Sequence, residues 1–379
     1  MRWPSLAVER VRPSRFRPPF CPWPECPAHH GPPARFHRHG VYRRPSDRAR
    51  IPRYRCLACG RTCSRQTFSC TYYLKRRHLP PLVAAGLVAC SAHRQIARSL
   101  GCAKTTVTRA AERLTRHAIL FQARSLAHLG AVSEPVVHDH FETFVQRQDH
   151  ALGIGTAVGS SSWFVLDVDP APHRGSGRRP DRSASQGFSP PPSSYVASIL
   201  RTLDRLAPLV PEDGMPLPLA SDGRSDYRVA LAQHPAAASF RLEAYPNPER
   251  GPKGSPRSRE AVVRDAAMFP ADQLHQLVRH STADHKRETI AFSRRLESIV
   301  GRVFLGAVWK NFVKGRSERK PDRRTPAMLL ALSEAPWSWS KLLRQRLFPA
   351  REPVPAPWRK LYGRSWSEGL PTHAAKHTF

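Results

Sequence analysis

The segment Pro135–Phe144, PVVHDHFETF, decides the fold that we predict for this chain, because it places one carboxylate inside an apolar and aromatic run. β-Branched and aromatic residues in such a run predict a buried strand. Burying a carboxylate is costly unless it is paired or bound to a metal ion. Asp139 is therefore a candidate site residue; the alternative is a strand-end aspartate that faces water.

Strand and helix patterns alternate after this segment. Two β-like runs follow, ALGIGTAVG and SSWFVLDVD, and then come a helix pattern at 195–210, a strand at 216–223, a helix pattern at 225–234 and a strand at 238–246. Three strands, helix, strand, helix and strand predict an α/β fold with a mixed sheet, in the order of an RNase H-like core. The first and fourth strands of such a sheet are neighbours, so we expect Asp139 and Asp222 to meet.

Two cysteine pairs lie upstream, in CPWPEC at 21–26 and CLAC at 56–59. In a reducing compartment, cysteines are better explained as metal ligands than as a disulfide framework. Four thiolates from two such pairs can close a tetrahedral zinc site, and the ribbon between them is too small to fold without metal. We therefore predict a structural zinc ion held by Cys21, Cys26, Cys56 and Cys59. The substitutes that stay open are His29, His30, Cys63 and Cys70.

The sequence from Ser91 to Ala118 has the pattern of a helix-turn-helix. Gly101 supplies the turn, and apolar residues recur at helical spacing on both sides of it. The second helix would direct polar and basic side chains toward phosphates and base edges in a major groove: Lys104, Thr105, Thr106, Thr108, Arg109 and Arg113. The alternative is an ordinary helical hairpin with a solvated basic face.

Positive charge is concentrated in the first third of the chain. Lys and Arg total 61 against 29 Asp and Glu, a formal charge of +32, and residues 1–130 alone hold 25 basic and 4 acidic side chains. Such concentration predicts a polyanionic partner bound through phosphate contacts. The sequence has neither an apolar run of membrane-spanning length nor the apolar core of a signal peptide. We expect double-stranded DNA as the partner and a cytoplasmic, nucleoid-associated protein.

Three carboxylates from separate elements can hold two magnesium ions, which activate a water or a 3′ hydroxyl for in-line attack on a phosphodiester. With the cysteine pairs, the helix-turn-helix pattern and two aspartates in this order, the chain resembles DDE-type transposases of bacterial insertion sequences. The resemblance spans about Cys21 to Arg324 and is carried by CPWPEC…YRCLACGRT, IARSLGCAKTTVTRAAERL, DHFETF, LASDGRSDYR and HKRETIAFSRRLE…VWKNFVK. It implies a metal-dependent enzyme, acting as a homo-oligomer, that nicks transposon ends and joins the 3′ hydroxyl to target DNA.

The third acid departs from the family pattern, which has a glutamate shortly before an arginine-bearing helical stretch. Asp272, in FPADQLHQLVRH, stands at that place, and Glu288 is the alternative. Pro270 predicts that a helix begins here, where the helix dipole also favours a purely structural aspartate. We expect Asp139, Asp222 and Asp272 to be catalytic and to bind magnesium.

The pattern divides the chain into four parts. We expect a zinc-ribbon DNA-binding region at 1–75, a helix-turn-helix domain at 76–130, a catalytic domain at 131–325 and a basic aromatic extension at 326–379. Two stretches rich in Pro, Gly and Arg, near 170–194 and 246–258, predict flexible insertions in the catalytic domain.

The remaining acids and histidines of this region receive structural interpretations. Glu142 is expected on the face of the strand opposite to Asp139, as a salt-bridge partner. Asp167 and Asp169 are expected to be solvated, and His138 and His140 to be hydrogen-bonded in the core. Two other functions stay open: a DNA-binding regulator or inactive transposase remnant that does not cut, and a nuclease that cuts without joining strands.

Overall fold

The computed structural model describes residues 16–31, 34–148, 150–173, 194–212, 214–249, 251–252, 254–287, 289–317 and 322–366. The chain forms two compact units. The N-terminal unit comprises Met1–Arg77 together with Leu343–Arg351, and the main unit comprises His78–Leu342 together with Glu352–Phe379. A segment near the C-terminus therefore belongs to the unit that the first residues build.

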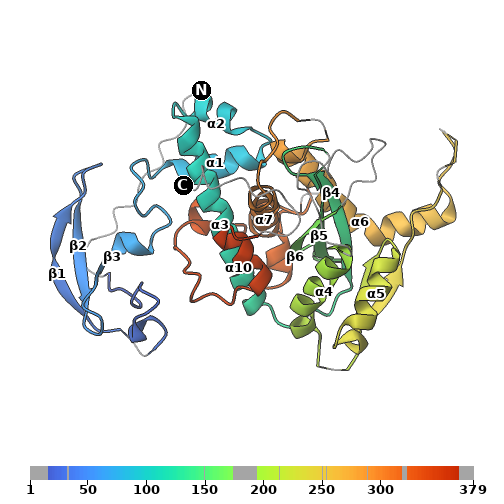
Figure 1. The fold of residues 1–379 in the computed structure, drawn as a ribbon, viewed down its shortest axis with the longest axis horizontal. Helices are drawn as coiled ribbons and strands as arrows, with labels where there is room; N and C mark the ends of the chain where they lie inside the picture. Colours follow the sequence, from blue (N-terminus) through green and yellow to red (C-terminus); the bar gives the residue numbers. More distant parts are fainter. Residues whose placement is uncertain are drawn as a thin grey trace. The chain divides into compact units, whose positions relative to one another are not determined.

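A small antiparallel sheet forms the N-terminal unit, with the strands β1 (Phe36–Arg43), β2 (Arg50–Cys56) and β3 (Thr62–Ser64) in that order (Figure 1). The 3-10 turns η1 (Pro27–His29) and η2 (Arg65–Phe68) flank it. Most of β1 is exposed, so this sheet has almost no core of its own.

An aromatic cluster supplies part of the missing core of the N-terminal unit. The ring centroid of Phe20 lies 5.2 Å from that of Phe68 and 5.2 Å from that of Phe348. Phe348 comes from the C-terminal segment of the unit, and Arg346 nearby donates its backbone N–H to the carbonyl oxygen of Phe68. The C-terminal segment of this unit thus completes its core, because residues 16–77 alone are too few to build a sufficient one.

The main unit begins with three helices, α1 (Leu79–Val88), α2 (His93–Ser99) and α3 (Lys104–His128). Gly101, at φ +56°, makes the turn between α2 and α3, where an L side chain would be strained. The apolar residues that repeat along the first half of α3 are buried: Val107, Ala110, Ala111 and Leu114. The helices that periodicity predicted at this place are present.

A five-stranded mixed sheet follows, in the order β6-β5-β4-β7-β8. Figure 1 labels β4, β5 and β6 of this sheet. Its strands are β4 (Val136–Phe144), β5 (Ala151–Gly159), β6 (Val165–Pro172), β7 (Leu217–Ser221) and β8 (Phe240–Ala244). β4, β5 and β6 pair antiparallel, whereas β7 runs parallel to β4 and β8 parallel to β7. The expected α/β class with a mixed sheet is confirmed, and β4 and β7 are neighbours.

Successive residues of a strand point to opposite faces, and β4 shows which helices cover each face. His138 and His140 contact Tyr227 and Ser198, which lie on α5 (Ser225–Gln233) and α4 (Ser194–Leu206). Phe141 on the other face contacts His275 of α6 (Arg259–Ser281). The face that bears Asp139 is therefore the face covered by α6.

α6 begins eleven residues before Pro270, so the prediction that a helix starts at this proline was wrong. Ser258 caps the true N-terminus by accepting a hydrogen bond from the backbone N–H of Ala261. Inside a helix, Pro270 removes one backbone hydrogen bond. Packing offsets this loss, because Met268 and Ala271 are fully buried in a cluster with residues of β4 and β7.

Two aspartates of β6 also differ from their prediction. Asp167 and Asp169 were expected to be solvated at a strand end, but both are fully buried because β6 continues to Pro172. Arg205 of α4 contacts Asp167 at 2.6 Å and Asp169 at 2.7 Å, and Arg201 pairs with Asp169 at 2.6 Å. A buried network of charges thus joins α4 to the sheet.

The C-terminal part of the main unit packs on this core. α7 (Leu296–Phe312) is largely buried, and the short helices α8 (Pro326–Leu329), α9 (Trp339–Leu342) and α10 (Ala356–Gly363) follow. Trp358 of α10 is fully buried and donates its indole N–H to the carbonyl oxygen of Val168. The described end of the chain is part of the core, although its sequence gave little periodicity.

The two predicted insertions connect regular elements. The one placed at 170–194 overlaps the end of β6 and the start of α4, and residues 174–193 lie outside the described part of the chain. The other, at 246–258, joins β8 to α6. Among the described helices, none combines the length and the apolar character that crossing a membrane requires.

Candidate functional site

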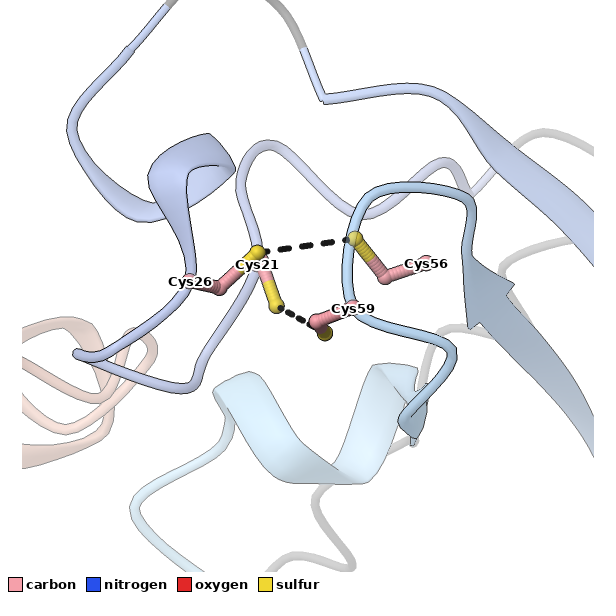
Figure 2. Close-up of side chains that lie close together, drawn as sticks. All are labelled: Cys21, Cys26, Cys56 and Cys59. Carbon is pink, nitrogen blue, oxygen red and sulfur yellow. Dashed lines mark hydrogen bonds between the residues drawn. The ribbon is translucent and has the colours of Figure 1, made fainter.

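Four cysteine sulfurs converge in the N-terminal unit (Figure 2). All four Sγ atoms lie within 4.8 Å of one another; Cys21 and Cys59 are 3.6 Å apart, and Cys26 and Cys56 are 3.9 Å apart. A tetrahedral zinc site with Zn–S bonds of about 2.3 Å places its sulfurs about 3.8 Å from one another. The geometry therefore fits a structural metal such as zinc, held by the four cysteines that the sequence predicted.

Local turns hold these cysteines. Cys56 ends β2, and the backbone N–H of Gly60 donates to its carbonyl oxygen at 2.9 Å. Gly60 has φ +71°, a conformation that suits glycine at the end of this tight loop. In the first cysteine pair, the backbone N–H of Cys21 donates to the carbonyl oxygen of Ala28. This bond closes the loop that contains Cys26.

The proposed substitutes do not enter this cluster. His29 directs Nδ1 to the carbonyl oxygen of Cys21 at 2.6 Å, so its ring braces the loop from outside. Cys63 is buried in a different cluster, with Phe68 and Phe348. Cys70 donates to the carbonyl oxygen of Gln345. The cluster therefore consists of Cys21, Cys26, Cys56 and Cys59.

A second candidate site lies on the α6 face of the main sheet. Asp139 stands in the middle of β4, Asp222 directly follows the neighbouring parallel strand β7, and Asp272 lies on α6. The Asp139 carboxylate accepts a hydrogen bond from the backbone N–H of His140 at 2.8 Å. Asp222 accepts one from the backbone N–H of Arg224 at 3.2 Å, across a turn made by Gly223 at φ +80°.

Asp222 and Asp272 both act electrostatically on Asp139. Burial and the negative charges of Asp222 and Asp272 raise the pKa of Asp139 to about 7. Burial also raises the pKa of Asp222. A carboxylate with such a pKa is held in an environment that favours either a proton or a cation.

Asp272 has a cationic partner of its own. Arg264, two turns earlier on α6, forms an ion pair with it and lowers the pKa of Asp139 as well. Within the described residues, the cysteines are the one group of three or more potential ligands whose atoms come within 4.8 Å of one another. The carboxylates are thus close enough to influence one another without forming a ready metal site. Glu288, the alternative third acid, lies outside the described residues.

His275 is a neighbour of Asp139 that sequence reasoning missed. Its Nδ1 lies 3.7 Å from the Asp139 carboxylate, and its Nε2 lies 2.9 Å from the hydroxyl of Thr156. That hydroxyl donates to the carbonyl oxygen of Asp139, so Nε2 donates to the hydroxyl and Nδ1 keeps its lone pair. Burial lowers the pKa of His275 to about 3, which makes the ring neutral.

A neutral imidazole at this place does not offset the charge of the Asp139 carboxylate. The signal in the sequence was the spacing of His275 three residues after Asp272, which places both on one side of the helix. That spacing alone could not show which strand residue they face.

The other residues of β4 have structural roles. Glu142 accepts a hydrogen bond from Tyr195 and lies 2.8 Å from Nε2 of His173, on the face opposite to Asp139. His138 and His140 are buried, and burial lowers the pKa of both rings. They contact Tyr227 and Ser198, as hydrogen-bonded core histidines do.

The residues predicted to contact DNA lie along the first turns of α3. Lys104, Thr105 and Arg109 are exposed, whereas Thr106, Thr108 and Arg113 are half-buried. The Thr108 hydroxyl donates to the carbonyl oxygen of Lys104 at 3.1 Å and lies 3.0 Å from Nδ1 of His93. Thr108 therefore helps to hold the start of α3 within the protein.

Comparison with models of protein families and with curated proteins found no match to this chain, so the geometry described above carries the functional argument.

Proposed function

We propose that this chain is a DNA transposase that cleaves transposon ends and transfers the 3′ strand to target DNA with the help of magnesium. The observation that carries the proposal is the placing of two aspartates on neighbouring parallel strands. Asp139 lies in the middle of β4 and Asp222 directly after β7, in a mixed sheet with the order β6-β5-β4-β7-β8. This order supports an RNase H-like core.

The electrostatics of the carboxylates support a divalent ion in this place. Two acids that raise the pKa of a third make a site where a cation is stabilised. Carboxylate oxygens are the ligands that magnesium prefers, and two such ions can activate a hydroxyl and stabilise the leaving oxygen. Asp139, Asp222 and Asp272 would hold them. His275 would keep Asp139 oriented, since it is tied to the same strand through Thr156.

Other parts of the chain support DNA binding. The cysteine cluster supports a zinc ribbon, and α2 and α3 support a helix-turn-helix whose exposed first turn carries Lys104, Thr105 and Arg109. The concentrated positive charge of the front of the chain suits phosphate contacts on double-stranded DNA. Synapsis of two ends would require more than one copy of the chain.

Nicking of the protein's own element tests this proposal. In Mg²⁺, the full chain is expected to nick a duplex that carries the terminal repeats flanking its coding region. Asp139→Asn and Asp222→Asn are expected to abolish nicking and to leave DNA binding within about twofold, because neither change alters the basic surfaces. Asp204→Asn, which changes an exposed acid of α4, is the matched control and should nick normally. Nicking that survives both changes would remove the proposal.

A second function is favoured by one observation. Asp272 is paired with Arg264, so the third carboxylate is partly neutralised. If Asp272 stays paired with Arg264 and holds no magnesium, the chain would bind DNA without cutting it, as a regulator or an inactive remnant. Strong DNA binding with no magnesium-dependent nicking on any end sequence would favour this function.

A further inference from the structure

A small hollow that is partly open to solvent lies in the main unit, beside the helix that carries Asp272. Four parts of the chain line it. Trp163 comes from the turn between β5 and β6, Gln273 and Leu277 from α6, and Pro326 from the start of α8. The end of α7 and the residues after it supply Lys310, Lys314, Gly315 and Arg316.

The charge of this hollow has one sign. Lys310, Lys314 and Arg316 are cationic, and no acid is among the residues that line it. Asp322, which is close enough to be affected by Arg316, forms its own pair with Arg324 at 3.0 Å. Among the described residues, three cationic side chains and no carboxylate thus line the hollow.

Lys310 is the most informative of the three cations. Only 4% of its surface is exposed, and its ammonium donates to the backbone carbonyl oxygen of Trp163 rather than to a carboxylate. Burial, followed by the charges of Arg316 and Lys314, lowers its pKa to about 7. A buried ammonium without a counter-charge is unfavourable, so an anion in the hollow would relieve a cost that the free protein carries.

The turn that holds Trp163 is fixed in an uncommon conformation. Trp163 has φ +61°, which a bulky side chain rarely adopts. Glu134 holds the turn by accepting the backbone N–H groups of Ser161 and Ser162. The guanidinium of Arg316 lies 4.3 Å from the centre of the Trp163 ring, so the indole in turn positions a cation at the hollow.

One further polar group points to a ligand. The side-chain oxygen of Gln273 is buried and has no hydrogen-bond partner. An amide can rotate by half a turn and then offers its NH₂ group in place of the oxygen. The hollow combines cationic side chains with an amide donor and with the apolar side chains of Leu277 and Pro326. This combination suits an anion with several acceptor oxygens.

We propose that this hollow is a phosphate-binding site, which takes either a phosphate group of a nucleic-acid strand or a free phosphate. Gln273 follows Asp272 directly on α6, so the hollow and the carboxylate site share this helix. The nucleic-acid form of the inference rests on the proposed function, whereas phosphate binding itself does not.

Calorimetric titration of the full chain tests the site. Inorganic phosphate and the dinucleotide d(TpT) are titrated separately at constant ionic strength. Lys310→Met and Arg316→Gln are each expected to weaken binding by about tenfold, the effect of losing one charge-assisted contact. Lys341→Gln is the matched control, because Lys341 is exposed and lies over the ring of Trp337 outside the hollow; it should change binding by less than about twofold.

Proton uptake separates this site from general attraction by a basic protein. At pH 8, Lys310 is mostly neutral, and an anion beside it raises its pKa, so binding of d(TpT) should take up protons. The heat should then depend on the buffer's ionisation enthalpy for the unchanged chain and not for Lys310→Met. Equal loss in all three variants, or no proton uptake with d(TpT) and phosphate alike, would overturn the proposal.

The two ligands distinguish the source of the phosphate. Tighter binding of d(TpT) than of inorganic phosphate supports a nucleic-acid strand, and binding of inorganic phosphate alone supports a free anion. Asp139→Asn should bind both ligands normally, so a failure of nicking and a failure of phosphate binding are separate results.

Discussion

Two strands of the same sheet bury aspartates in opposite ways. Asp167 and Asp169 on β6 are fully buried, and the arginines of α4 pair with both. Asp139 on β4 is also largely enclosed, yet no arginine forms an ion pair with it among the described residues, and the charges of Asp222 and Asp272 raise its pKa. In the paired aspartates, each partner offsets the cost of burying the other, whereas the charge of Asp139 is offset only in part and is held at a cost to stability that a function must justify.

The cysteine cluster is the extreme case of this comparison, because its thiolates need a cation to stay together. Cys56→Ser should unfold the N-terminal unit and leave the main unit folded, since binding of a structural zinc contributes about 10 kcal/mol or more to such small units. Zinc content and hydrogen exchange of the N-terminal amides measure the outcome. Cys70→Ser, in the same unit but outside the cluster, is the control. A folded, zinc-loaded Cys56→Ser protein would contradict the assignment.

Removing an arginine from the paired aspartates should give the next largest change in the free energy of unfolding. Arg205→Met leaves Asp167 without its arginine inside the protein and should lower the free energy of unfolding by about 3 to 5 kcal/mol. Arg241→Met breaks an exposed pair with Glu243 and should cost less than about 1 kcal/mol. Urea denaturation measures both. Equal effects would show that burial of the charges does not decide their contribution.

At Asp139 we expect the opposite change: a substitution should raise the free energy of unfolding. Its pKa is about 7 in the folded chain and near 3.8 when unfolded, so its charge destabilises the fold progressively as pH rises between these values. Asp139→Asn should therefore raise the free energy of unfolding by roughly 2 to 4 kcal/mol at pH 8 and by little at pH 4. Denaturation of both proteins across this pH range checks the prediction. A variant that is destabilised at pH 8 would refute the unpaired state of Asp139.

The smallest expected effect is a change in the pKa of Asp139 when Arg264 is substituted. This residue lowers the pKa of Asp139, so Arg264→Gln should raise that pKa further, by less than about one unit. Carbon-13 NMR of labelled aspartate carboxyls follows the titration directly. Arg257→Gln, which removes an exposed arginine paired with Asp265, should leave the titration of Asp139 unchanged.

Local patterns allowed much of this molecule to be predicted. The apolar run around Asp139 gave β4, the alternating elements after it gave the mixed sheet, and the two cysteine pairs gave the cluster of four sulfurs. Each single strand, helix or cysteine pair is indicated by residues that lie within a few positions of one another, which is the range over which periodicity and motif spacing act.

Other features depend on residues that are far apart in the chain. The aspartates of β6 find Arg201 and Arg205 more than thirty residues away, and Phe348 completes an aromatic cluster begun by Phe20. The start of α6 was misplaced because Pro270 is the usual first residue of a helix, while packing of its neighbours on the sheet overrides that preference here. No short pattern could have indicated these contacts.

A crystal structure of the chain soaked in manganese tests the central claim most directly. The account predicts anomalous density within about 2.2 Å of carboxylate oxygens of both Asp139 and Asp222, with a third acid, Asp272 or Glu288, completing the ligands. Asp272 would then have to leave Arg264. Manganese that binds elsewhere, or that leaves Asp139 protonated and without a metal contact at pH 8, would contradict the account.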